Sequence, residues 1–209
     1  MIPVNVLAVQ YLSSAPESLC KALGAPKGYP CLGLITTDSD DATYIALDEA
    51  TKAADVQVCY SRSFYAGAAN ASTPNAGEVI GILAGATPGA VRSGMEAALS
   101  ALRKIGFEAA GEVPYLAYTV SRSGAFLSKE AGVSEGTALA YLIAPPLESM
   151  YALDAAMKAA DVKLQKLYAP PSETNFGGGL LSGTQSACEA ACAAFAQAVK
   201  EVADHPKGV

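Results

Sequence analysis

The chain has 209 residues, of which 51% are apolar and only 16% charged, and its formal net charge is −6. Its 14 Lys and Arg residues form no basic stripe, so we expect no nucleic-acid partner. No apolar run approaches the roughly 18 residues of a membrane helix, and no basic segment precedes the apolar start as in a secretory signal, so we expect a cytoplasmic protein without a membrane partner.

Both strands and helices are predicted in the first half from the periodicity of its apolar residues. The expected strands and helices are, in chain order, a strand at 4–12, a strand at 31–37, a helix at about 41–54, strands at 56–64 and 78–85, and a helix at about 88–105. Pro88 is expected in the first turn of the second helix, where its missing N–H costs nothing.

The second half repeats this order. The segment IALDEATKAADVQV (45–58) returns as YALDAAMKAADVKL (151–164), at an offset of 106 residues. The expected elements are strands at 115–123, 138–144, 162–168 and 180–183, and helices at about 147–160 and 185–203. A repeat of this length predicts two domains, 1–109 and 110–209. Each is expected to be an α/β (α+β) unit with a small mixed sheet and two main helices.

Two long loops occupy the same place in both halves. They are rich in Gly, Pro and Asn, at 65–77 and 169–179. Connections of this length are longer than a compact domain needs, so both loops are candidates for function.

The densest acidic cluster is TDSDDAT (37–43), which contains Asp38, Asp40 and Asp41. A calcium-loop pattern fails, because Ala42 falls on a ligand position and Thr43 on the position that requires glycine. Two interpretations stay open: Asp40 or Asp41 caps the first helix, or the pair attracts a small cation. The second repeat has APPLES at this place, so the acidic feature occurs once per chain.

Glu78 and a cysteine pair each allow a structural and a functional interpretation. Glu78 is either a solvated acid at a strand end or a carboxylate that faces the same opening as the aspartates. Cys188 and Cys192 lie one helical turn apart. We expect them to be small buried residues and not ligands of a soft metal, because no second CxxC and no His is nearby. Five cysteines without a framework of pairs fit a reducing compartment.

Enzyme motifs are largely missing. The only histidine, His205, lies in the C-terminal tail, and the sequence contains neither a phosphate-binding loop nor a dinucleotide-binding glycine pattern. We therefore expect no enzyme and no required cofactor. The alternative that remains is a divalent-metal enzyme that uses Asp38, Asp40 and Asp41.

Several long segments resemble one family. LGLITTDSDDATYIALDEATKAADVQV, SRSFYAGAANASTPNAGEV, YLIAPPLESMYALDAAMKAADVKL and PPSETNFGG resemble the tandem-domain, trimer-forming shell proteins of the ethanolamine-utilisation bacterial microcompartment. The resemblance implies two circularly permuted microcompartment domains and a flat, pseudohexameric homotrimer in the microcompartment shell, beside other shell proteins. It also explains the repeat, since two near copies per chain supply six positions from three chains.

The resemblance assigns the paired loops to a gated central pore of the trimer. The residues expected there are Ala69, Asn70, Ser72, Thr73, Asn75, Thr174, Asn175, Phe176, Gly177, Gly178 and Gly179. The three glycines are expected to give the second loop the backbone freedom of a gate. Passage or binding of cobalamin is a further possibility that the family suggests.

Relatives also have small acidic pores that bind ethanolamine. The matching positions here are Asp40, Asp41 and Glu78, with Phe107 as a weaker candidate. An acidic constriction suits an ammonium group and selects cations over anions. The alternative from another class is a cytosolic small-ligand sensor built on the same tandem scaffold.

Overall fold

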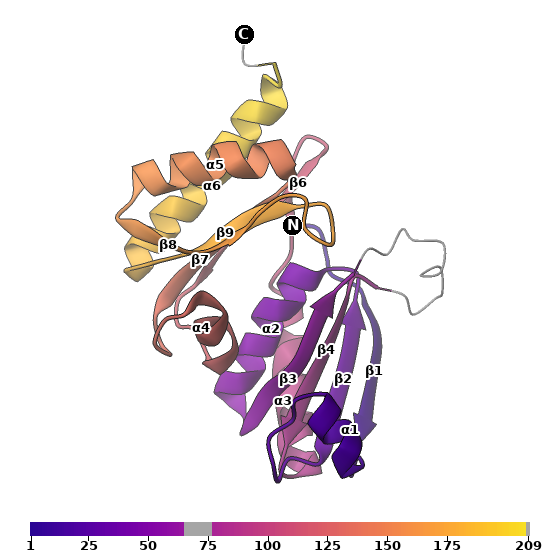
Figure 1. Cartoon of the computed structure of the whole chain (residues 1–209). Coiled ribbons are helices and arrows are strands. Elements are labelled where there is room, and N and C mark those ends of the chain that lie inside the picture. Colours follow the sequence, from indigo (N-terminus) through magenta and orange to yellow (C-terminus); the bar gives the residue numbers. More distant parts are fainter. Residues whose placement is uncertain (65–76, 208–209) are drawn as a thin grey trace. The chain divides into compact units, whose positions relative to one another are not determined.

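The computed structural model describes residues 1–64 and 77–207 (Figure 1). Its contacts divide the chain into two compact units. The N-terminal unit contains Pro3–Gly106 and Gly124–Leu127, and the C-terminal unit contains Met1–Ile2, Phe107–Ser123 and Ser128–Val209. None of the helices in these described residues is both long enough and apolar enough to span a membrane.

The N-terminal unit is a four-stranded sheet with the strand order β1-β2-β4-β3. Its elements are β1 (Val6–Leu12), α1 (Glu17–Ala22), β2 (Cys31–Thr37), α2 (Asp40–Ala53), β3 (Val56–Ser63), β4 (Val79–Gly85) and α3 (Pro88–Leu102). All six predicted elements are confirmed to within a few residues, and the short helix α1 was not predicted.

Successive side chains of each strand point to opposite faces of the sheet, and both faces are covered by helices. On one face, α2 and α3 approach closely at glycines: a Cβ at Gly33 would lie 2.7 Å from Val91, and a Cβ at Gly81 would lie 2.6 Å from Leu47. On the other face, Leu32 belongs to an apolar cluster that also contains Cys20 of α1. The sheet is therefore the centre of a three-layer arrangement, with β2 and β4 in its middle.

The start of α3 follows the prediction made from Pro88. Pro88 occupies the first turn, and the Thr87 side chain accepts a hydrogen bond from the Ala90 N–H at 3.2 Å. This is the usual combination of a threonine cap and a proline without a donor to lose.

The C-terminal unit is a five-stranded sheet with the strand order β5-β6-β7-β9-β8. Its elements are β5 (Glu108–Ala110), β6 (Val113–Val120), β7 (Ala138–Ala144), α5 (Pro146–Ala159), β8 (Val162–Tyr168), β9 (Gly177–Gly183) and α6 (Gln185–Asp204), and α4 (Ala125–Ala131) begins in the residues assigned to the N-terminal unit. Cys188 and Cys192 of α6 are buried in the core of this unit, as the structural interpretation of this pair predicted.

The expectation of mixed sheets is wrong in one respect, because every strand pairing in the described residues is antiparallel. β2 and β3 run in the same direction, as a strand–helix–strand unit requires. They are not neighbours, because β4 lies between them and pairs with both. β9 separates β7 from β8 in the same way.

The loop predicted at 169–179 ends earlier than expected. Gly177, Gly178 and Gly179 belong to β9 and pair with Ala144, Ile143 and Leu142 of β7. A Cβ at Gly178 would lie 1.9 Å from the carbonyl oxygen of Leu142. The glycines thus permit close strand packing, and the prediction that they lend freedom to a loop is wrong.

Candidate acidic ligand site

The acidic cluster forms where β2 leads into α2. Asp40 and Asp41 occupy the first turn of α2, and each is only 7% exposed. The N-cap residue is Ser39, whose side chain makes no capping hydrogen bond, so the prediction that an aspartate is the cap is wrong. Asp40 instead accepts a hydrogen bond from the Asp41 N–H at 2.9 Å. Both carboxylates still gain from the positive end of the helix dipole.

Two threonines hold the backbone that presents these aspartates. The Thr37 Oγ1 accepts a hydrogen bond from the Ser39 N–H at 3.1 Å and lies 2.7 Å from the Thr43 Oγ1. Thr43 in turn donates to the Ser39 carbonyl oxygen at 2.8 Å. Because Thr37 and Thr43 are fully buried, this turn fixes the direction in which α2 leaves the sheet.

Asp40 also contacts the end of β3. The Ser63 hydroxyl hydrogen-bonds to the Asp40 carboxylate, and the Ser63 Oγ lies 2.5 Å from the Tyr44 hydroxyl. Burial raises the pKa of Asp40, while hydrogen bonds from Ser63 and Asp41 oppose that rise. Neither Ser63 nor Tyr44 was among the residues expected at this site from the sequence.

Glu78 is held beside the aspartates by its backbone. Its N–H donates to the Thr37 carbonyl oxygen at 2.8 Å, and its own carbonyl oxygen accepts from the Phe64 N–H at 3.0 Å. Burial, together with the negative charges of Asp40 and Asp38, raises the pKa of Glu78 to about 7. The structure thus brings Glu78 close to Asp40 and Asp38, and Asp41 adjoins Asp40 in the first turn of α2, so negative charge is crowded here.

Asp38 has a separate structural partner. The Asn5 backbone N–H and side-chain amide donate to its two carboxylate oxygens, at 2.8 and 2.6 Å. In the described part of the chain, no three His, Cys, Asp or Glu side chains are grouped to hold a metal ion. The metal-enzyme alternative at Asp38, Asp40 and Asp41 therefore has no geometric support. The cluster is suited to bind a cationic group by charge-assisted hydrogen bonds.

The remaining predicted residues fall in other places. Phe107 belongs to the C-terminal unit, where its ring centroid lies 5.6 Å from that of Phe176. Thr174 is buried, and Asn175 has a positive φ of 66° in a turn closed by Ser172. The first-loop candidates lie outside the described residues: Ala69, Asn70, Ser72, Thr73 and Asn75.

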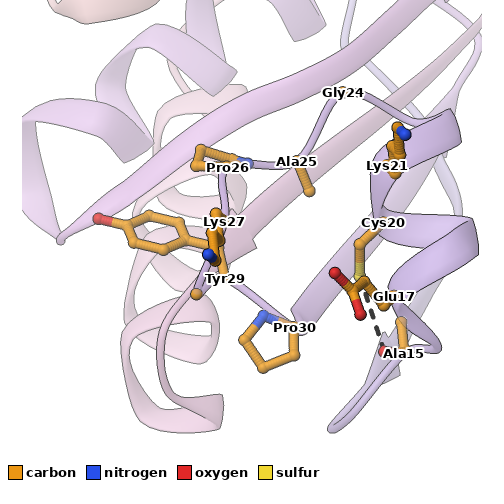
Figure 2. A pocket seen from close by; sticks show the side chains of 11 residues that line it. Ala15, Glu17, Cys20, Lys21, Gly24, Ala25, Pro26, Lys27, Tyr29 and Pro30 are labelled. Carbon is orange, nitrogen blue, oxygen red and sulfur yellow. Dashed lines mark hydrogen bonds between the residues drawn. The ribbon is translucent and has the colours of Figure 1, made fainter.

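A concavity lies at the opposite end of β2 from the acidic residues. It has a volume of about 430 Å³ and lies between α1 and the segment Gly24–Pro30 (Figure 2). Its lining is mainly apolar, and Lys21 and Lys27 contribute amines. Among the lining residues, the Cys20 thiol donates to the Ala15 carbonyl oxygen at 3.7 Å (Figure 2). This cavity was not expected from the sequence, because α1 is too short to show a helical period.

Comparisons with known proteins agree with this architecture. Residues 31–114 match the BMC domain family. The chain is 58% identical to the bacterial microcompartment shell protein EutL of Clostridium perfringens, over 100% of this chain and 98% of that one. It is 46% identical to the EutL of Salmonella typhimurium, over 99% of this chain and 96% of that one.

A solved structure extends the likeness to three dimensions. The ethanolamine utilization protein EutL from Leptotrichia buccalis superposes with a TM-score of 0.96 at 57% identity, over 99% of this chain and 97% of that chain. These findings confirm the resemblance, the tandem α/β fold and the expectation of a structural, non-enzymatic role. The chain therefore belongs to the EutL family of bacterial microcompartment shell proteins, the structural shell components of the ethanolamine-utilisation compartment.

Proposed function

We propose that three copies of the chain form a flat pseudohexameric ring in the shell, packed beside other shell proteins. Residues 1–109 and 110–209 would be the two shell domains of each copy. The support is the repeat itself, because duplicated α/β units present similar edges and head-to-tail contacts between similar edges close into rings. The loops around 69–75 and 174–176 would surround the central opening and gate it.

We further propose that the acidic cluster of Asp40, Asp41 and Glu78 binds ethanolamine. The observation that carries this proposal is the electrostatic state of Glu78, whose pKa is raised to about 7 by burial and by its acidic neighbours. Carboxylates that repel one another gain most from a cation placed between them.

Ethanolamine offers groups that match this cluster. Its ammonium group supplies three donors to carboxylate oxygens, and its hydroxyl both donates and accepts. Ser63, which hydrogen-bonds to Asp40, adds a neutral partner next to the acids. A site of this kind prefers a small amino alcohol to an anion and still releases it by competition with water.

Calorimetric titration of ethanolamine at pH 8 tests the proposal. Wild-type protein is expected to bind, and the Asp40→Asn/Asp41→Asn double variant is expected to lose at least about tenfold in affinity, since each charged hydrogen bond contributes about 1.5–3 kcal/mol. Unchanged affinity in that variant would remove the site.

Two controls separate charge in this cluster from charge in general. Glu148→Gln removes the acid in the first turn of α5, the helix of the second repeat that corresponds to α2, and is expected to leave binding unchanged. Ethanol carries the hydroxyl without the ammonium group and is expected to show no binding. Equal binding of ethanol and ethanolamine would contradict a charge-based site.

A further inference from the structure

Helix α5 carries an exposed stripe that is largely apolar. Leu147 is 63% exposed, Tyr151 is 49% exposed and Met157 is 42% exposed. Met150 and Asp154 lie on the same face, at the three- and four-residue spacing of one side of a helix. We call these five residues the α5 stripe. An exposed patch of large apolar side chains indicates a contact surface.

The corresponding stripe in the first repeat is not exposed. At the offset of 106 residues, Ile45 of α2 corresponds to Tyr151 and is fully buried. The Asp48 side chain is 0% exposed, whereas that of its counterpart Asp154 is 63% exposed. The same position on the same kind of helix is thus covered in one repeat and open in the other.

A short segment contacts the corresponding face of α2, which carries Tyr44, Asp48 and Thr51. It is Gly124–Leu127, at the start of α4, and it belongs to the N-terminal unit. The Asp48 carboxylate accepts hydrogen bonds from the N–H groups of Gly124 and Leu127, at 2.7 and 2.8 Å. Thr51 Oγ1 accepts from the Ala125 N–H at 3.1 Å, and the rings of Tyr44 and Phe126 lie 5.9 Å apart.

The first half contains a structural counterpart of this covering segment. The Gly24 N–H donates to the Lys21 carbonyl oxygen at 3.2 Å, and the Gly132 N–H donates to that of Lys129 at 3.3 Å. Both glycines have positive φ, 75° and 66°. Helix α1 therefore corresponds to α4 at an offset of 108 residues, and Pro16–Leu19 corresponds to Gly124–Leu127.

Within the described residues, the segment Pro16–Leu19 is not packed against a helix in the way that Gly124–Leu127 is packed against α2. Leu127 is only 1% exposed, whereas Leu19 is 40% exposed. Glu17, Cys20 and Lys21 line the cavity beside α1, and Leu19 does not (Figure 2). The chain thus exposes both surfaces of a contact that it makes once internally, namely the α5 stripe and the segment Pro16–Leu19.

We propose that the α5 stripe of one copy packs against Pro16–Leu19 of a second copy. This inference rests on the proposed homotrimer and names the surface that holds it together. The contact joins two different surfaces, so a second copy still has a free stripe for a third, and the series closes when the rotation allows.

The residue changes between the repeats make the α5 side of this contact more apolar than the α2 side of the internal one, while Glu17 and Ser18 stand where the covering segment has Ala125 and Phe126. Leu147 stands where the first repeat has Asp41, and Met157 stands where it has Thr51. A Cβ at Gly124 would lie 2.5 Å from Thr51 Oγ1, so Pro16 at the corresponding place requires a wider approach. Long, flexible methionine side chains suit such a wider gap.

Single substitutions on each surface test the inference. Tyr151→Glu and Leu19→Glu both place a charge in the contact, and each is expected to weaken trimer formation at least about 100-fold in sedimentation velocity, as removal of a central apolar anchor does. Ala193→Glu adds the same charge at an exposed position of α6 and is expected to leave the trimer intact. Circular dichroism confirms that each variant is folded.

Mixing the two variants distinguishes this contact from a symmetrical one. A Leu19→Glu chain keeps its α5 stripe and a Tyr151→Glu chain keeps its α1 surface, so an equimolar mixture is expected to form dimers that neither variant forms alone. If both folded variants remain trimeric, the inference is overturned and the proposed homotrimer stands. If the wild-type protein is monomeric, the homotrimer and the inference both fail. If only Tyr151→Glu dissociates, the α5 stripe contacts a surface other than Pro16–Leu19 and the inference is overturned.

Discussion

The carboxylate of Asp48 accepts a hydrogen bond from the backbone N–H of Leu127 at 2.8 Å, across 79 residues of sequence. Asp48 is fully buried, and it also accepts a hydrogen bond from Gly124. A single side chain therefore ties the first turn of α4 to α2. Its counterpart in the second repeat, Asp154, instead pairs with Lys158 at an exposed site.

Asp48→Ala is expected to destabilise the protein by about 3 kcal/mol, because it leaves two buried N–H groups without an acceptor. Glu49→Ala is the matched control on the same helix. It removes an exposed ion pair with Lys52 and is expected to cost less than about 1 kcal/mol. Urea unfolding monitored by circular dichroism measures both. Equal losses for the two variants would contradict the role assigned to Asp48.

Glu78→Gln is expected to stabilise the protein at pH 8 and to have little effect at pH 5. The folded state raises the pKa of Glu78 from 4.5 to about 7, so the folded protein binds more protons than the unfolded chain between these values. Stability from this group is therefore present at low pH and is lost as pH rises through 7. Thermal unfolding at the two pH values checks the prediction, and an equal shift at both would contradict it.

Ethanolamine affinity is expected to decrease as the pH is lowered, since the ammonium group binds ionised Glu78 better than protonated Glu78. If Glu78 must be ionised, its pKa of about 7 implies a loss of about fivefold between pH 7 and pH 6. Titration of the wild type and of Glu78→Gln measures the effect. The variant is expected to bind more weakly and to lose this dependence, and a variant that retains it would place the titrating group elsewhere.

Gly178→Ala is expected to destabilise the protein by about 3 kcal/mol or more, because the new methyl group would collide with the backbone of Leu142. Gly89→Ala, in the first turn of α3, meets only Thr87 Oγ1 at 3.9 Å and is expected to be neutral or stabilising. Chemical denaturation compares the two. A tolerated alanine at position 178 would mean that β9 does not pack on β7 as described.

The long elements were predictable because each carries its own apolar pattern and appears twice. The strands Ala138–Ala144 and Val162–Tyr168 have the predicted bounds. Helices α1 and α4 were missed, since six or seven residues are too few to show a helical period. Their place depends on tertiary contacts such as those of Asp48, which the local sequence does not contain.

The acidic site was predictable in part. The adjacent aspartates at a helix start were visible in the sequence, and Glu78 was placed with them from its position at a strand start and from the family resemblance. The contribution of Ser63 depends on which residue of β3 reaches Asp40, and β3 contains a register shift between Val58 and Tyr60 that no local pattern indicates. The glycines at 177–179 were misjudged, since glycine is typical of loops and only occasionally marks a strand that another backbone approaches closely.

Electron microscopy of concentrated wild-type protein tests the central claim most directly. The account predicts flat, three-chain particles with pseudosixfold outlines that associate edge to edge into sheets. Dispersed single chains of 21.2 kDa at every concentration would contradict it.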